Sequence, residues 1–268
     1  MDRVDSLEAE QLLDEELLLY ARQILLNGWD IDAQLRLKSA RVVIIGAGGL
    51  GCPASETLVR AGLGQVHLID DDVIEASNLQ RQTLFLPEDI DKPKALTAAK
   101  MLERINPLII ARGTVARLSE DNAYEWLEIA SGKPDLLLDC TDNFATRDII
   151  NRISVRYQIP LLSASAIGMQ GQLALFEPHL NTGCYHCVFG SVVLDAEADE
   201  RTCANSGVLA STTAIMGNLQ ANTALQYLGL TKNPLTNKLL LWDGSQMQQR
   251  LMGYREDPQC PVCNSHLS

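Results

Sequence analysis

The chain has 268 residues, of which 46% are hydrophobic, and it carries a formal net charge of −12. That length and hydrophobic content suffice to bury one large core, whereas the acidic balance argues against a nucleic-acid partner, whose phosphate backbone is bound mostly through Lys and Arg. The sequence has neither an apolar run of roughly 18 residues nor the basic start of a signal peptide, so we expect a soluble, cytoplasmic protein without a membrane span.

The region before the first strand is predicted to be helical. Over residues 5–26, apolar side chains such as Leu13 and Leu17 recur at helical spacing, which indicates an amphipathic helix. Arg22 lies within this stretch, and the ordinary interpretation of an arginine on a helix is a solvated position. Residues 35–40 then lead into the first strand.

A glycine-rich turn follows the first predicted strand. The four β-branched residues 42–45 are typical of a strand buried on both faces of a parallel sheet. Gly46, Gly48 and Gly51 have the G-x-G-x-x-G spacing, in which missing Cβ atoms allow a tight turn and a close approach to phosphates. A helix over residues 50–61 should direct its first N–H groups at an anion. The segment predicts a nucleotide site without specifying the nucleotide.

Polar side chains follow the next predicted strand, residues 65–69. Asp70 ends that strand, at the distance from the glycines where a carboxylate can hold a ribose hydroxyl. Asn78, Arg81 and Gln82 are spaced by three and four residues, so one helical turn would present them on one side. Taken alone, Arg81 would be interpreted as surface charge.

Two further groups lie at positions where α/β sheets bind ligands. Lys94 lies at the start of a helix expected to end near residue 105, after a proline that suits a first turn. Asp142 and Asn143 follow the strand predicted over residues 135–139, at the carboxyl edge where doubly wound sheets bind ligands. Asp142 can either cap the next helix, residues 144–157, or hold Mg²⁺ beside phosphates.

The remaining elements continue an α/β pattern. We expect strands over residues 108–111, 160–166, 171–176, 238–242 and 247–251, and helices over residues 120–130 and 208–228. The last helix is nearly uncharged, which predicts burial in the molecule or in a subunit interface. The charged residues 192–205 predict a mobile loop across the active face.

Four of the seven cysteines form two C-x-x-C pairs, Cys184 with Cys187 and Cys260 with Cys263. In a cytosolic protein, disulfides are the less favoured interpretation. The two pairs can complete one tetrahedral Cys₄ zinc site that closes the C-terminal half onto itself. The alternatives are ordinary buried thiols or a redox pair, and neither pair lies at the turn of an obvious βα unit.

The combination of charges favours ATP over a nicotinamide cofactor. A dehydrogenase would use the glycines and Asp70 in the same way, but it has no evident use for Arg81, Lys94 and Asp142. An ATP-using enzyme needs cations and a metal to meet the charge of the phosphates. The sequence lacks a G-x-x-x-x-G-K-[ST] loop, which argues against P-loop chemistry.

From Tyr20 onward the sequence resembles the MoeB/ThiF adenylyltransferases, relatives of the ubiquitin-activating enzymes. The matching motifs are Y-A-R-Q-I at 20–24, G-A-G-G-L-G at 46–51, S-N-L-Q-R-Q at 77–82, Lys94 after Pro93, D-C-T-D-N at 139–143, C-Y-H-C at 184–187 and C-P-V-C at 260–263. The resemblance implies that Asp70 holds the ATP ribose and that Asp142 binds Mg²⁺. It also implies structural Zn²⁺ on the four paired cysteines.

The resemblance assigns further roles to single residues. The implied ATP-binding set is Gly46, Gly48, Gly49, Gly51, Asp70, Asp72, Asn78, Arg81, Gln82, Lys94, Asp142 and Asn143, and the implied catalytic set is Arg22, Arg81, Lys94 and Asp142. Arg22 would reach into the neighbouring subunit of a homodimer. Cys203 matches a cysteine that bonds covalently to the carrier in ThiF-like members and is dispensable in MoeB-like members.

The implied reaction is ATP-dependent adenylylation of the C-terminal glycine carboxylate of a ubiquitin-like sulfur carrier. A MoaD-type carrier, for molybdenum cofactor synthesis, is the leading expectation, and a ThiS-type carrier, for thiamine synthesis, is the alternative. A sulfurtransferase or cysteine desulfurase is a possible further partner. A nicotinamide-dependent oxidoreductase and a non-catalytic scaffold are the alternatives from other classes.

The expected fold is α/β, with a Rossmann-like, mostly parallel sheet covered by helices on both faces and extended by antiparallel strands and the Cys₄ site. We expect one adenylation domain over residues 1–268. Within it, residues 1–40 form an N-terminal helical segment, residues 41–166 a nucleotide-binding half, and residues 167–268 a carrier-binding half that contains the zinc site.

Overall fold

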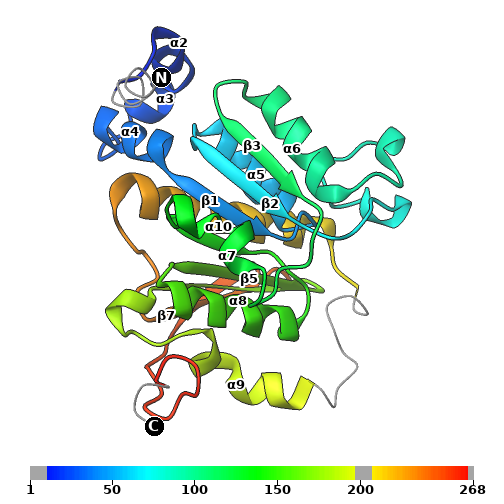
Figure 1. The fold of residues 1–268 in the computed structure, drawn as a ribbon, viewed down its shortest axis with the longest axis vertical. Coiled ribbons are helices and arrows are strands. Elements are labelled where there is room, and N and C mark those ends of the chain that lie inside the picture. The colour runs from blue at the N-terminus through cyan, green and yellow to red at the C-terminus, as the bar shows by residue number, and fades with distance from the viewer. Residues whose placement is uncertain (1–10, 197–206, 265–268) are drawn as a thin grey trace.

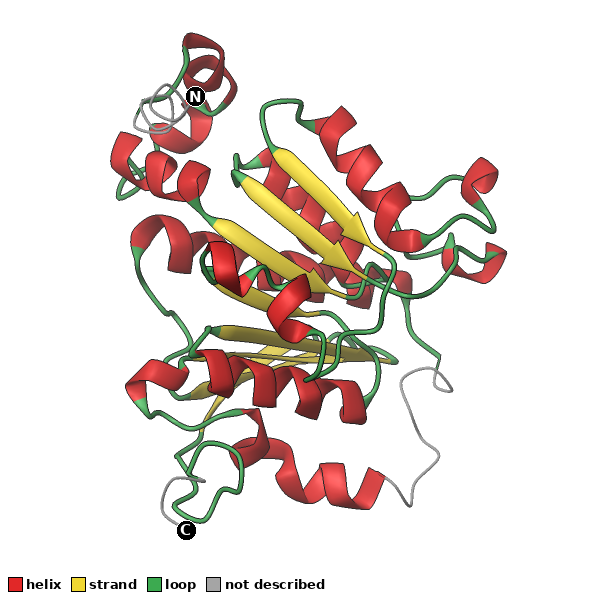
Figure 2. Ribbon diagram, in the orientation of Figure 1, coloured by secondary structure: helices red, strands yellow, loops and turns green. Residues whose placement is uncertain are grey.

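The computed structural model describes residues 11–196 and 207–264. Its centre is an eight-stranded sheet in the order β3-β2-β1-β4-β5-β6-β7-β8 (Figure 2). The strands are β1 (Arg41–Ile45), β2 (Gln65–Ile69), β3 (Ile110–Thr114), β4 (Leu136–Asp139), β5 (Leu161–Ile167), β6 (Gln170–Phe176), β7 (Lys238–Asp243) and β8 (Gln248–Gly253). In this order the first five strands, β3, β2, β1, β4 and β5, pair in parallel, and β6, β7 and β8 are added antiparallel. The predicted fold class is confirmed.

Helices cover both faces of this sheet (Figure 1). They are α2 (Asp14–Leu19), α3 (Ala21–Ile24), α4 (Ile31–Ser39), α5 (Gly51–Arg60), α6 (Lys94–Ile105), α7 (Ala123–Trp126), α8 (Phe144–Tyr157), α9 (Tyr185–Ala196) and α10 (Ala210–Leu230). One core cluster joins the sheet to α4, α5, α6 and α10, and a second joins its other face to α7 and α8. Val42 and Ile44 of β1 belong to the first cluster and Val43 and Ile45 to the second, so β1 is buried on both faces as predicted.

The single helix predicted over residues 5–26 is wrong for the part of the chain that the structure describes. The helix is divided into α2 and α3 at Tyr20, whose backbone leaves the helical region. Tyr20 is buried, and its hydroxyl accepts a hydrogen bond of 2.9 Å from the Asn106 amide. This anchor redirects the chain, so that Leu13 and Leu17 remain 48% and 38% exposed instead of packing on the core.

Other boundaries also differ from the prediction; the strand predicted over residues 108–111, for example, is β3 at Ile110–Thr114. The helix expected over residues 120–130 shortens to α7 and a 3-10 turn, because Glu128 adopts a left-handed conformation with φ of 51°. The loop predicted over residues 192–205 begins inside α9, which continues to Ala196, and its remainder lies outside the described residues. The long helix predicted at residues 208–228 is confirmed as α10, which packs against α4, α5, β5 and β6.

Candidate nucleotide site and metal centre

A cavity of about 850 Å³ lies at the carboxyl ends of the parallel strands, where β1, β2 and β4 end. With one exception, the residues predicted to bind ATP line it: Gly46, Gly48, Gly49, Asp70, Asp72, Asn78, Arg81, Gln82, Lys94, Asp142 and Asn143. The exception is Gly51, which begins α5 behind the loop. The parallel topology therefore brings together groups that are separated by up to a third of the sequence.

The glycines of the loop have different reasons for lacking a side chain. Gly46 has φ of +96°, and a Cβ there would lie 2.8 Å from the carbonyl oxygen of Cys140. A Cβ on Gly51 would overlap the carbonyl oxygen of Gly46. At Gly48 the nearest atom to a Cβ is the side-chain amide nitrogen of Gln82, at 3.6 Å, so a Cβ would fit in ordinary contact without a clash. Gly46 and Gly51 thus shape the loop, and Gly48 leaves room for a ligand.

The carboxylate of Asp70 is held rigidly at the end of β2. Its two oxygens accept backbone hydrogen bonds from Ala47 N–H, at 2.7 Å, and from Asp72 N–H, at 2.8 Å. Burial raises the pKa of Asp70, and the hydrogen bond from Ala47 opposes this shift. Asp70 therefore ties the glycine loop to the second strand while facing the cavity.

Cationic side chains line another part of the cavity. The Lys94 ammonium lies 2.8 Å from an Asp72 carboxylate oxygen, and the side chain of Lys94 is only 8% exposed whereas that of Asp72 is 66% exposed. Arg81 donates a 3.1 Å hydrogen bond to the carbonyl of Ser77. The side-chain amide oxygen of Gln82, Oε1, is buried and has no hydrogen-bond partner among the described residues. An anionic ligand in the cavity would meet the cations Lys94 and Arg81 directly.

Of the two roles considered for Asp142, helix cap or Mg²⁺ ligand, the cap is supplied by its neighbour. Asn143 is the N-cap of α8, and its side chain accepts a 2.8 Å hydrogen bond from Thr146 N–H. The carboxylate of Asp142 is therefore not needed as a cap. Asp142 is exposed and lines the cavity, so it is free to hold a hard cation beside an anionic ligand.

A buried ion pair beneath Asp142 was missed by sequence reasoning. Arg147 of α8 lies 3.0 Å from the carboxylate of Asp139, the last residue of β4, and both residues are buried. Arg147 also donates to the Ser163 hydroxyl and to the Ala164 carbonyl of β5. The only sequence signal is an arginine in the second turn of a helix that follows the ligand-binding edge.

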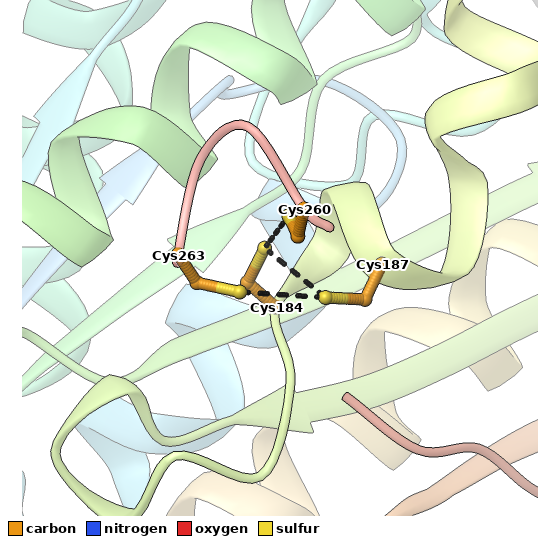
Figure 3. Close-up of side chains that lie close together, drawn as sticks. All are labelled: Cys184, Cys187, Cys260 and Cys263. Carbon is orange, nitrogen blue, oxygen red and sulfur yellow. Dashed lines mark hydrogen bonds between the residues drawn. The ribbon is translucent and has the colours of Figure 1, made fainter. Parts of the chain in front are cut away.

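The four paired cysteines converge on one point between the start of α9 and the C-terminal segment (Figure 3). Their sulfurs all lie within 4.8 Å of one another, with separations of 3.4 Å for Cys187 to Cys263, 3.7 Å for Cys184 to Cys260 and 3.9 Å for Cys184 to Cys187. A tetrahedral zinc ion with Zn–S bonds of about 2.3 Å requires sulfurs about 3.8 Å apart. The predicted grouping of the cysteines is confirmed, and its size fits zinc.

Hydrogen bonds to the sulfurs complete this centre. The Asn151 amide of α8 donates to the sulfur of Cys184 at 3.5 Å, and the N–H of Asp257 donates to that of Cys187 at 3.4 Å. The oxygen of Asn151 accepts from Tyr185 N–H at 3.0 Å. Such outer contacts orient thiolate ligands, and they join the centre to α8.

Comparison with known proteins identifies the family, because residues 20–262 match the model of the family described as "ThiF family". The chain belongs to the ThiF family. The sulfur carrier protein ThiS adenylyltransferase of Escherichia coli is 41% identical over 93% of this chain and 96% of its own length. The molybdopterin-synthase adenylyltransferase of Salmonella typhimurium is 39% identical over 94% of this chain and 98% of its own. The crystal structure of E. coli MccB with ATP is 25% identical, with a TM-score of 0.72 over 86% of this chain and 69% of that one.

Besides Gly51, one described residue that was predicted for the site does not line the cavity of this ThiF-family chain. Arg22 is exposed on α3 and does not line the cavity; α3 lies beside the amino ends of the strands, at the opposite edge of the sheet (Figure 1). Cys203 lies outside the described residues. The thiols of Cys52 and Cys140 are buried, and burial raises the pKa of Cys52 to about 12. No described helix is long and apolar enough to cross a membrane.

Proposed function

We propose that this protein adenylylates the C-terminal glycine carboxylate of a ubiquitin-like sulfur carrier, with ATP as the donor. The observation that carries this proposal is the single cavity that joins a glycine loop, two cations and the exposed carboxylate of Asp142. A MoaD-type carrier is the leading candidate and a ThiS-type carrier the alternative. The names of the relatives do not choose between them, because proteins of both kinds are about equally identical to this chain.

Each part of ATP has a counterpart among the cavity residues. Asp70, fixed by two backbone N–H groups, would accept hydrogen bonds from the ribose hydroxyls. The loop at Gly48 and the start of α5 would face the phosphates, with Asn78, Arg81 and Lys94 around them. Asp142 would hold Mg²⁺, which would neutralise phosphate charge when bound.

The chemistry asks the protein for positioning and for charge stabilisation. The carboxylate of the carrier is already ionised at neutral pH, so no general base is needed. Its oxygen would attack the α-phosphorus of ATP, forming the acyl adenylate and releasing pyrophosphate. Lys94 and Arg81 would stabilise the charge that develops on the departing pyrophosphate. The acyl adenylate would then accept sulfur, for which a sulfurtransferase or cysteine desulfurase is the proposed source.

The carrier would dock on the half formed by residues 167–268. Ile167, Met169 and Leu209 are 41%, 42% and 49% exposed, and the backbone of Gly168 pairs with that of Val208, which lines the cavity. These residues form an apolar surface beside the cavity. Because the whole chain is acidic, an apolar surface would let a carrier that is also acidic dock without relying on opposite charges.

We further propose a homodimer in which Arg22 enters the site of the partner. Leu18 and Leu25, on either side of α3, are each 81% exposed, and apolar surface of this kind is typical of an interface. Arg22 has no ion-pair partner among the described residues and does not line its own cavity. Helix α3, which carries it, lies beside the amino ends of the strands (Figure 1). Zinc on the four cysteines and a reducing, cytoplasmic location complete the proposal.

Pyrophosphate exchange tests the proposed function. The protein would be incubated with ATP, Mg²⁺, labelled pyrophosphate and either a MoaD-type or a ThiS-type carrier. We expect label to enter ATP only when one carrier is present, and we expect no exchange when the carrier lacks its terminal glycine. Exchange with neither carrier, or tight NADH binding without ATP binding, would overturn the proposal.

The same assay tests the shared site. Arg22→Ala and Asp142→Ala should each abolish exchange alone. After dissociation and mixing in equal amounts, about a quarter of the sites should be complete, because half of the dimers are mixed and each mixed dimer has one intact site. No recovery on mixing would contradict a site shared between subunits.

A further inference from the structure

The turn that carries Asp142 is tied down by one buried carboxylate. One oxygen of Asp139 accepts from the N–H of Thr141, at 3.0 Å, and from its hydroxyl, at 2.7 Å. The other oxygen accepts from the Ser163 hydroxyl at 2.6 Å and from Arg147 at 3.0 Å. The strand end, the turn and the neighbouring strand therefore meet at Asp139.

Arg147 of α8 completes this network around the turn. Its guanidinium donates to the Asp139 carboxylate, to the Ser163 hydroxyl at 3.1 Å and to the Ala164 carbonyl at 2.8 Å. It also donates to the carbonyl of Thr141, the residue directly before Asp142. The turn is thus held to β4, β5 and α8 at once.

This geometry favours an arginine. The guanidinium reaches its acceptors from two nitrogens, Nη1 toward Asp139, Ser163 and Ala164 and Nη2 toward the Thr141 carbonyl, whereas an ammonium has a single nitrogen. Arg147 and Asp139 are only 4% and 1% exposed, so the acceptors of this network are largely shielded from bulk water. A lysine at this position would keep the charge but leave acceptors of the network without a partner.

We propose that Arg147 is a positioning residue that sets the direction of the Asp142 carboxylate. Arg147 and Asp142 both line the cavity, but the donors of Arg147 are engaged by the protein, so it acts on the ligand through the turn. The inference rests on the proposed function, in which Asp142 holds Mg²⁺ beside ATP. Ligation of a metal by a carboxylate depends on contacts of this kind, which commonly contribute about tenfold or more in metal affinity.

The test compares ATP affinity with and without Mg²⁺ in the full-length protein. Arg147→Lys should lower ATP affinity about tenfold in saturating Mg²⁺ and leave it nearly unchanged in EDTA. Ser163→Ala, which removes one shared hydroxyl and is the milder change, should shift affinity in the same direction by a smaller factor. Arg152→Lys is the matched control, because Arg152 lies on the same helix and pairs with Asp148, outside the Asp139 network; it should change neither value.

A double variant separates positioning from general loosening. If Arg147 acts through Asp142, Arg147→Lys should add no further loss of Mg²⁺-dependent affinity in an Asp142→Asn background. Equal losses of ATP affinity in Mg²⁺ and in EDTA, or losses that add in the double variant, would overturn the proposal. If Arg147→Lys does not fold, a Ser163→Ala protein with the ATP affinity of the parent would overturn it. If Asp142→Asn alone leaves the Mg²⁺ dependence intact, the metal role in the proposed function fails instead.

Discussion

Gly48 of the loop and Gly51 at the start of α5 lie three residues apart, yet a methyl group would meet different surroundings at each. Gly51→Ala would force its Cβ against the carbonyl oxygen of Gly46, whereas Gly48→Ala would place its Cβ in ordinary contact with the Gln82 side chain, beside the cavity. We expect Gly51→Ala to lower the free energy of unfolding by about 1–3 kcal/mol, the usual cost of overpacking.

Gly48→Ala should instead change the free energy of unfolding by less than about 0.5 kcal/mol and weaken ATP binding, because the methyl group occupies the space left for phosphates. Urea unfolding and ATP titration of both variants check this pair. A Gly48→Ala protein that binds ATP as tightly as the parent would show that the phosphates do not approach this glycine.

Single residues differ in how readily sequence reveals them. The glycines, Asp70 and Asp142 were predictable, because local spacing and the end of a strand suffice to place them. Arg147 was not predictable, because its partners Asp139 and Ser163 come from two different strands, and only the folded sheet brings them together.

At the scale of elements, β2 contains a buried histidine that links stability to pH. His67 is 7% exposed, and its Nε2 lies 2.7 Å from the Thr114 hydroxyl of β3. Burial lowers the pKa of His67 below its usual value of 6.5, although the nearby Glu128 opposes the shift. As the pH falls below about 6.5, His67 therefore becomes protonated in the unfolded chain before it does in the folded chain. The free energy of unfolding decreases as the pH falls through this range.

We expect His67→Gln to lose less stability than the parent between pH 7.5 and pH 5.5, measured by urea unfolding. His179→Gln is the matched control, because His179 is an exposed histidine; it should follow the parent. An identical loss in the parent and in His67→Gln would contradict the linkage.

Boundaries of elements were predictable where the local pattern agrees with tertiary contacts. Helix α8 was predicted over the residues that it occupies, because the local pattern places a capping side chain just before it, although the cap is Asn143 and not Asp142. The break at Tyr20 depends on a hydrogen bond to Asn106, 86 residues away, and no local pattern contains that information. The left-handed Glu128 that shortens α7 is likewise a non-glycine exception that sequence preferences do not predict.

At the scale of the whole molecule, helix α8 connects the two centres. It begins at the turn that carries Asp142, contains Arg147, and contributes Asn151 to the cysteine centre. The sheet order places the cavity among the parallel strands, while the antiparallel strands and the cysteine centre build the half proposed to receive the carrier. One chain would thus join the proposed nucleotide site to the proposed surface for a protein substrate.

The measurement that tests the central claim most directly follows an oxygen atom from the carrier to AMP. A carrier whose C-terminal carboxylate is labelled with heavy oxygen would be incubated with the protein, ATP and Mg²⁺. Hydroxylamine would then cleave the acyl adenylate at its acyl carbon and release AMP. If the carboxylate attacks the α-phosphorus, the released AMP carries a labelled oxygen by mass spectrometry. Unlabelled AMP, or label recovered in pyrophosphate, would contradict the account.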